Sequence, residues 1–264
     1  MTAKCDPFVL FAQARSGSSN LLRVLQLHPQ LHVAEEPFQQ KFPLWNPGEP
    51  NYLARIVDVR SMEEQLSVLF SKYDGIKVLD YELPKDIYSY MLLRPDIKVI
   101  ALRRHNLLQQ AVSGFIAKQT GIWKMWDLKG DLATAYRGLQ PIDLDALEEN
   151  LEYRQELNQH YADILSLKPA RMCLQFVYEE LFTSDVAQNR AAVRNIFLFL
   201  GLSMPEGEEL NNLIDPKVSK INNAGTYEML PNVRIIDEQF GSDETGWLFE
   251  KDVTADYADD TECN

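Results

Sequence analysis

A polar segment at residues 15–20, Arg-Ser-Gly-Ser-Ser-Asn, holds residue types that bind anionic oxygen atoms. Serine and asparagine cap the first turn of helices, and a glycine lets the backbone come close to a ligand. The free N–H groups of a helix start, several hydroxyls and one guanidinium together suit a phosphate or sulfate group. An ordinary turn with a capping serine is the alternative, and the anion site is the favoured interpretation. The candidate residues are Arg15, Ser16, Gly17, Ser18, Ser19 and Asn20.

The segments on either side of this turn predict the elements that position it. Residues 8–12, Phe-Val-Leu-Phe-Ala, form an apolar run of strand length. Between Leu21 and Leu27 the apolar residues recur with a helical period. A strand, a polar turn and an amphipathic helix in this order predict a P-loop-like strand–loop–helix nucleotide site.

Strands and helices alternate along most of the remaining chain. Apolar runs and helical periodicity predict strands at 31–34, 75–81, 97–102 and 171–177, and helices at 62–73, 86–93, 107–120, 144–167 and 187–200, the last closed by Gly201. This alternation indicates an α/β fold of three layers with a central parallel sheet. Because ligands of such sheets bind beyond the carboxyl ends of the strands, segments 15–20 and 104–106 and the segment after Val177 are expected to meet.

The last quarter of the chain carries a weaker signal. Periodicity fades from Met204, and scattered glycine and proline residues predict a loop-rich segment that ends near residues 247–249. Residues 250–264 hold six acidic residues and one lysine, so we expect an acidic, disordered tail there. The predicted organisation is a single domain over residues 1–249 followed by this tail.

The composition excludes several classes of protein. The chain has 264 residues, 45% of them hydrophobic, and a formal net charge of −13. This length suffices for a full core, whereas the negative charge argues against nucleic acid or an anionic membrane as the main partner. The sequence has no integral membrane segment, and Asp6 and Pro7 interrupt any signal-peptide profile, so a cytoplasmic location is expected. The cysteines and histidines lack metal-ligand spacing, which predicts no metal site.

A second segment also holds residues that could bind an anion. Arg104 stands at the end of a predicted strand, and Ser113 follows nine positions later on the next helix. A guanidinium and a hydroxyl in this arrangement would suit one phosphate. Together with residues 14–19, this segment resembles the sulfotransferase superfamily, although Ala14 stands where the family usually has proline.

Two further blocks follow in the order that the superfamily has. They are Val-Tyr-Glu-Glu-Leu at 177–181 and Phe-Leu-Gly-Leu at 199–202. The detail of residues 110–123 is most similar to the bacterial trehalose 2-sulfotransferase branch. The resemblance therefore covers residues 8–202 in four ordered blocks.

The resemblance implies an enzyme that transfers a sulfuryl group from 3′-phosphoadenosine 5′-phosphosulfate (PAPS) to a hydroxyl of a carbohydrate, a glycolipid or another small molecule. It implies that residues 15–20 hold the phosphosulfate, that Arg104 and Ser113 hold the 3′-phosphate, and that Tyr178 lies beside the adenine. Arg15, where many relatives have lysine, and Lys77 would stabilise charge on the leaving oxygen. The implied reaction requires no metal.

The general base is the least determined assignment. Related carbohydrate- and tyrosine-directed enzymes use a glutamate after the first helix, where this chain has Glu35 and Glu36. Glu36 is preferred because Glu-Pro-Phe resembles the usual continuation, and Glu35 is the alternative. In the trehalose enzyme's branch the base lies three positions further on, which here is Gln39, a residue that cannot act as a base. Asp80 and His105 are more distant candidates.

Two other functions remain open from the sequence. A small-molecule kinase shares the strand–loop–helix, but this turn has one glycine and lacks the Gly-x4-Gly-Lys pattern of the Walker loop. A non-catalytic nucleotide-binding or interaction domain of the same fold is the other alternative. The aromatic residues of 38–52 and the segment 221–247 are expected to shape the acceptor pocket, and the acidic surface disfavours polyanionic acceptors. The sequence carries no signal of oligomeric state.

Overall fold

The structure is a computed structural model of the chain, and it describes residues 5–39, 53–124, 127–219 and 222–249. The acidic tail at 250–264 and nearly all of the aromatic segment 38–52 lie outside the described residues. The chain divides into two compact units. Unit 1 comprises residues 1–105 and 152–221, and unit 2 comprises residues 106–151 and 222–264. The single domain expected over 1–249 stays a prediction.

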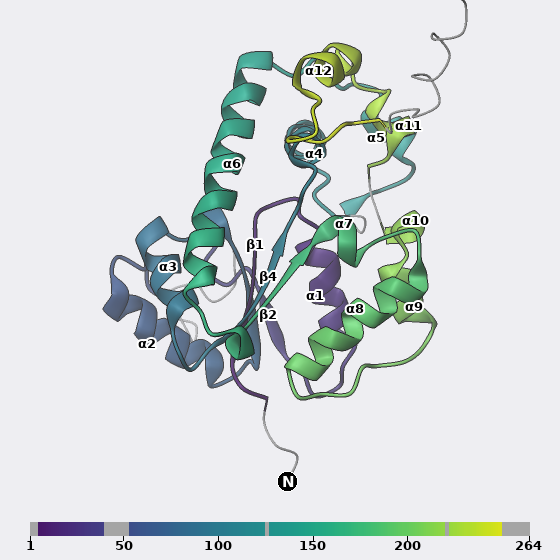
Figure 1. Cartoon of the computed structure of the whole chain (residues 1–264). Coiled ribbons are helices and arrows are strands. Elements are labelled where there is room, and N and C mark those ends of the chain that lie inside the picture. Colours follow the sequence, from purple (N-terminus) through teal and green to yellow (C-terminus); the bar gives the residue numbers. More distant parts are fainter. Residues whose placement is uncertain (1–4, 40–52, 125–126, 220–221, 250–264) are drawn as a thin grey trace, which may run out of the picture. The chain divides into compact units, whose positions relative to one another are not determined.

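A parallel sheet of five strands is the centre of unit 1. In the order β2-β3-β1-β4-β5, its strands are Val33–Glu35, Gly75–Leu79, Phe8–Ala12, Lys98–Arg103 and Cys173–Val177. Each neighbouring pair is parallel, with Phe8 opposite both Gly75 and Lys98. The predicted α/β fold with a central parallel sheet is therefore confirmed (Figure 1).

Alternation along β1 explains why helices cover both faces of the sheet. Val9 and Phe11 pack in one apolar cluster with helices on one face, which are α2 (Val59–Phe70), α3 (Lys85–Leu93) and the second half of α6 (Leu144–Ser166). Phe8 and Leu10 pack in another cluster with α1 (Ser18–Gln26), α8 (Val186–Phe199) and α9 (Glu208–Ile214). Every residue of β1 is buried, as expected of a central strand between two helical layers (Figure 1).

Unit 2 has its own apolar core. It is formed by α4 (Leu107–Thr120), α5 (Leu132–Tyr136), the first two turns of α6, α11 (Ala224–Tyr227) and α12 (Val233–Phe240). Buried residues of these helices include Leu108, Tyr136 and Ile236. Asn106 caps α4 by accepting from the Gln109 N–H at 2.8 Å, and Gly121 ends it in the left-handed conformation.

Most predicted elements are confirmed, with shifted ends where local turns intervene. The strand expected at 75–81 stops at Leu79, because Asp80–Glu82 forms the 3-10 helix η2. The strand expected at 171–177 begins at Cys173, because Ala170–Met172 forms the 3-10 helix η4. The helix expected from 62 begins at Val59, since Asp58 and Ser61 form a capping box.

The segment after Met204, expected to be rich in loops, also holds short helices that the sequence did not predict. It contains α9, α10 (Pro216–Ser219), α11 and α12, all between four and eight residues long; the equally short α7 (Tyr178–Leu181) lies earlier, directly after β5. Helices of one or two turns are too short to display a clear apolar period, so their caps carry the signal; the capping box of Asn223 and Thr226 at α11 is an example. No helix among the described residues has the length and apolar character to cross a membrane.

Candidate active site

The turn between β1 and α1 leaves hydrogen-bond donors available. Gly17 is the N-cap of α1 in the left-handed conformation (φ 85°), so it supplies no side-chain cap, and the first turn of α1 holds no acidic residue. Ser16 closes the turn by donating from Oγ to the Gln13 carbonyl at 2.7 Å. Among the described residues, none accepts a hydrogen bond from the N–H groups of Ser18 and Ser19. Such a helix start can receive an anion.

Lys77 is the buried charge at the centre of the site. It lies on β3 with 0% of its surface exposed. Its Nζ donates to Glu36 Oε1 at 2.6 Å, to Ser19 Oγ at 2.8 Å and to Glu35 Oε1 at 3.3 Å. The ammonium therefore joins the end of β2, which carries both glutamates, to the first turn of α1.

Glu36 has an unusual backbone conformation that fixes this arrangement. Its φ of 50° lies in the left-handed region, which residues other than glycine rarely occupy. The Glu36 N–H donates to the Lys77 carbonyl at 2.9 Å, which continues the contact between β2 and β3 by one residue. Gln39 Nε2 donates to Glu36 Oε2 and, at 2.9 Å, to the hydroxyl of Tyr81. The Glu36 carboxylate is thus held on both oxygens.

Arg104 approaches the turn from the end of β4. Its Nη1 donates to the Arg15 carbonyl at 3.3 Å, and its Nε lies 3.4 Å from Glu179 Oε1. The guanidinium carbon is 4.9 Å from the ring centre of Tyr178. Glu179 also accepts the His105 N–H at 2.9 Å, so the segments after β4 and β5 are joined. The expected meeting of these segments with the turn is confirmed within unit 1.

The ring of Tyr178 lies directly against the turn. A Cβ atom placed on Gly17 would come within 2.5 Å of this ring, so only glycine fits there. Tyr178 also packs against Phe182, with ring centres 5.2 Å apart. Burial raises the pKa of the Tyr178 hydroxyl, and the nearby Arg104 guanidinium opposes this. The Tyr178 ring therefore packs against the turn, and its contact with adenine stays a prediction.

Arg154 is a site residue that the sequence analysis missed. It lies on α6, and its Nη1 donates to Gln13 Oε1 and to the Ala14 carbonyl, both at 3.4 Å. Burial lowers the pKa of Arg154 to about 10; the Asp80 carboxyl opposes this, whereas the guanidinium groups of Arg104 and Arg15 lower it further. Three guanidinium groups therefore gather around one turn. The available signal was the position of Arg154, three residues after Leu151 and on its helical face.

Two acidic residues after β3 also lie near the site. Asp80 Oδ1 accepts the Ala14 N–H at 3.3 Å, and burial raises its pKa. Glu82 accepts the Leu79 N–H at 2.5 Å and the Phe38 N–H at 3.2 Å. Burial raises the pKa of Glu82 to about 8, and the Glu36 charge adds to this, while the two backbone N–H groups lower it. Glu82 was missed because it looked like an ordinary polar residue of a turn.

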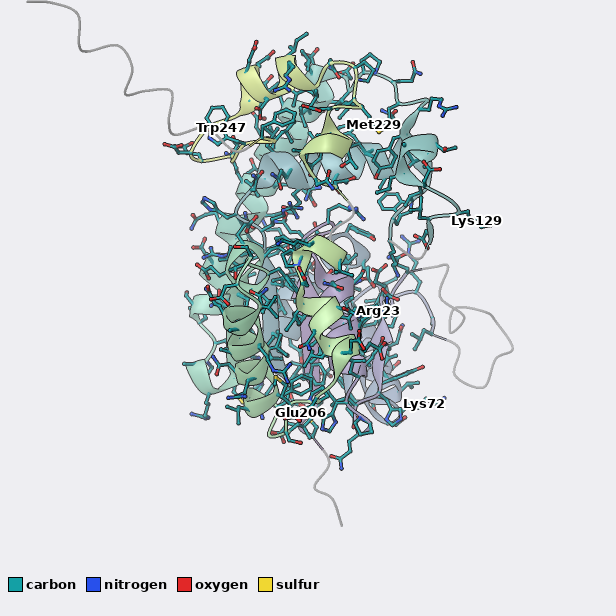
Figure 2. All side chains as sticks on the ribbon, turned by 90° about the vertical axis from the view of Figure 1, so that its right-hand side faces the viewer. Arg23, Lys72, Lys129, Glu206, Met229 and Trp247 are labelled. Carbon is teal, nitrogen blue, oxygen red and sulfur yellow. The ribbon has the colours of Figure 1, made fainter. Side chains whose placement is uncertain are left out.

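Ser113 belongs to unit 2 and is described with that unit. Its buried hydroxyl accepts from Asn222 Nδ2 at 3.0 Å, and Asn222 Oδ1 in turn accepts from the Tyr136 hydroxyl at 2.7 Å. In the same unit, Asn106 Nδ2 donates to the Trp247 carbonyl at 2.7 Å; Trp247 is labelled in Figure 2. The pairing of Ser113 with Arg104 at one phosphate stays a prediction.

The structure thus brings together, within unit 1, most of the residues that the sequence singled out. Around the turn lie Arg15, Ser16, Gly17, Ser18, Ser19, Glu35, Glu36, Lys77, Arg104 and Tyr178. Asn20 is different, because its Nδ2 donates away from the turn to the Leu213 carbonyl of α9 at 2.6 Å. The described residues include no cluster of three or more potential metal-ligating side chains.

Comparisons with known proteins give likenesses among solved structures. The chain is similar to a sulfotransferase from Alicyclobacillus acidocaldarius, with 15% identity, a TM-score of 0.46, and coverage of 85% of this chain and 99% of that one. It is similar to mouse sulfotransferase SULT7A1 complexed with PAP, with 17% identity, a TM-score of 0.43, and coverage of 83% and 68%. It is similar to the sulfotransferase domain of the Synechococcus PCC 7002 olefin synthase, with 17% identity, a TM-score of 0.42, and coverage of 93% and 87%.

A scan against protein-family models finds no match, and a search of the curated proteins finds none either. The functional interpretation therefore rests on the residues of the site.

Proposed function

We propose that the chain is a PAPS-dependent sulfotransferase that acts on a hydroxyl of a carbohydrate, a glycolipid or another small molecule. One observation carries this proposal: Arg15, Arg104 and Arg154 gather around a turn whose helix start has N–H groups to offer. Like charges repel one another, so a cluster of this kind is stabilised when a multiply charged anion binds to it. The order of motifs along the sequence indicates PAPS as that anion.

The turn and its surroundings supply what such a donor substrate needs. The N–H groups of Ser18 and Ser19 and the guanidinium of Arg15 would hold the phosphosulfate. Arg104 would hold the 3′-phosphate, together with Ser113. Lys77 reaches Ser19 Oγ at 2.8 Å, so its charge is directed at the same helix start. These groups would stabilise the charge that develops on the leaving oxygen.

Glu36 is the proposed general base. As the acceptor oxygen attacks sulfur, its proton passes to the Glu36 carboxylate and the new O–S bond forms. The bond between sulfur and the 5′-phosphate oxygen breaks, and its electron pair stays on that oxygen. The products are a sulfate ester and adenosine 3′,5′-bisphosphate. Glu36 fits this role better than Glu35, because Lys77 and Gln39 hold both of its carboxylate oxygens in place.

Nucleotide binding tests the donor site. At 100-fold excess over the dissociation constant, adenosine 3′,5′-bisphosphate should stabilise the chain by about 2.7 kcal/mol, a rise in melting temperature of about 5–10 °C. 5′-AMP and ATP should give clearly smaller shifts. Arg104→Ala should lose the response, whereas the matched control Arg103→Ala, at an exposed position next to it, should keep it. An equal response to AMP would contradict a 3′-phosphate site, and magnesium-dependent ATP turnover would favour a kinase.

Sulfuryl transfer tests the base. With labelled donor and fractions of a cell extract as acceptors, Glu36→Gln should bind the nucleotide yet lose transfer. Glu35→Gln should retain most of the activity. Full activity of Glu36→Gln would move the base to Glu35 or to another group.

A further inference from the structure

A cavity of about 560 Å³ follows β3 within unit 1. Helix η2 and the start of α3 form one wall, and the middle of α6 forms the other. Its lining includes three tyrosines and three acidic residues, which are Tyr81, Tyr88, Tyr153, Asp80, Glu82 and Glu156. The volume is that of a pocket for a small molecule. Its described lining residues belong to neither of the segments, 38–52 and 221–247, that were expected from the sequence to shape the acceptor pocket.

Two of the tyrosines expose their rings at this cavity. Tyr81, on η2, is 57% exposed, and Tyr153, on α6, is 50% exposed. Large aromatic side chains are usually more buried than this, and both rings line the same space. Exposed aromatic faces of this kind bind flat rings and cations, the latter because the ring face carries negative potential.

Acidic side chains outnumber basic ones in the lining of the cavity. Asp80, Glu82 and Glu156 face one cationic lining residue, Lys85. Burial raises the pKa of Asp80 and raises that of Glu82 to about 8. These raised pKa values mean that both carboxyls ionise less readily than usual; a positive group that entered the cavity would favour their ionised forms, whereas an anion would disfavour them.

Hydrogen bonds of Gln39 link the lining of the cavity to Glu36, the proposed base. The hydroxyl of Tyr81 accepts from Gln39 Nε2 at 2.9 Å, and the same nitrogen donates to Glu36. Glu82 accepts the N–H of Phe38, two residues after Glu36, at 3.2 Å. A molecule held between Tyr81 and Tyr153 would thus lie beside the segment that carries the base.

We propose that this cavity binds the acceptor, and that the acceptor is a ring-bearing organic cation whose protonated amine faces Asp80, Glu82 and Glu156. This assignment rests on the proposed function, because it names the acceptor of that reaction. The rings of Tyr81 and Tyr153 pack against the acceptor, and the carboxylates favour an acceptor with a positive charge over a neutral or anionic one. The hydroxyl that accepts the sulfuryl group points from the cavity toward Glu36.

Three probes of nearly equal shape separate charge from shape. They are tyramine, which is cationic, 4-ethylphenol, which is neutral, and 4-hydroxyphenylacetate, which is anionic. Calorimetric titration of the full chain at pH 7 should give tyramine an affinity about tenfold higher than that of 4-ethylphenol, and the anion should bind least. The reason is that one ion pair and two cation–π contacts each contribute about two- to fivefold.

Variants at the mouth of the cavity locate the binding. Glu156→Gln should weaken tyramine about threefold and leave 4-ethylphenol unchanged. Asp163→Asn, which removes a charge from the same helix outside the lining, should change neither. Tyr153→Leu keeps apolar bulk and should weaken tyramine about threefold, whereas Tyr153→Phe should restore it.

Equal binding of the three probes, preference for the anion, or no binding of tyramine would each overturn the inference. Titration with adenosine 3′,5′-bisphosphate distinguishes this failure from failure of the proposed function. If the nucleotide binds and tyramine does not, the acceptor assignment is wrong and the sulfotransferase proposal stands. If tyramine binds with the expected charge preference and the nucleotide does not bind, the cavity is a site for ring-bearing cations and the proposed sulfotransferase activity is wrong.

Discussion

Replacing Lys77 by methionine tests whether the centre of the site is held by electrostatics. The Nζ–Oε1 distance to Glu36 is 2.6 Å, which at an effective dielectric constant of about 20 corresponds to an attraction of roughly 6 kcal/mol. The same relation gives roughly 5 kcal/mol for Glu35 at 3.3 Å. Desolvation of the buried ammonium cancels much of this, so the net cost of removing it should be about 3–5 kcal/mol.

The assay is urea-induced unfolding at pH 7, followed by circular dichroism. Glu36→Gln alone should cost about 1–3 kcal/mol, because Lys77 keeps Glu35 and Ser19 as partners. The double variant Lys77→Met/Glu36→Gln should be less destabilised than the sum of the two by about 1–2 kcal/mol, because the second change removes a carboxylate that the first left without its ammonium partner. The control is Lys72→Met, at an exposed lysine labelled in Figure 2, which should change stability by less than about 0.5 kcal/mol.

Two results would refute this reasoning. One is a loss of less than about 1 kcal/mol in Lys77→Met, which would mean that the buried ammonium contributes little beyond its desolvation. The other is additivity of the two single changes, which would mean that Lys77 and Glu36 do not interact.

Three further predictions concern neighbouring residues. Gly17→Ala should lower stability by about 1–3 kcal/mol and abolish nucleotide binding, because a Cβ there meets the Tyr178 ring at a positive φ; urea unfolding and a nucleotide titration check this. Glu82 has its pKa raised from 4.5 to about 8, so the folded state binds its proton more tightly than the unfolded state, and this stabilisation is full below pH 4.5 and lost as pH rises through 8. Glu82→Gln should therefore gain stability relative to the parent chain between pH 5 and pH 8, and a constant difference across unfolding curves at pH 5, 6.5 and 8 would contradict the shift. Arg154→Met should weaken adenosine 3′,5′-bisphosphate about tenfold or more and Arg154→Lys less, measured by calorimetry; unchanged affinity in both would remove Arg154 from the anion site.

The centre of the sheet could be predicted from the sequence because β1 and β3, and β4 between its two ends, are buried on both faces. Such strands appear as continuous apolar runs, and residues 8–12 and 99–102 are entirely apolar. The turn after β1 could be predicted because a glycine and residues typical of helix starts stand between an apolar run and a helical period.

The rest of the site depends on contacts between distant parts of the chain. Arg154 lies more than 130 residues after the turn that it contacts, and an arginine on a long helix usually faces solvent. Glu82 owes its altered pKa to burial, which no local pattern of residues displays. Lys77 could be singled out only through the resemblance to the sulfotransferase superfamily. Its hydrogen bonds to Glu35, Glu36 and Ser19 became visible only in the structure.

The hydrogen bond from Asn20 to the Leu213 carbonyl bears on where the chain can be shortened. All four blocks that resemble the superfamily end by Leu202, so a fragment of 202 residues would contain every one of them. It would nevertheless lack α9, and with it the acceptor for Asn20 and three buried apolar side chains, Leu210, Leu213 and Ile214, of the cluster that covers α1. The amides at the start of α1 should exchange with solvent faster in such a fragment, because the turn would have lost its support from behind.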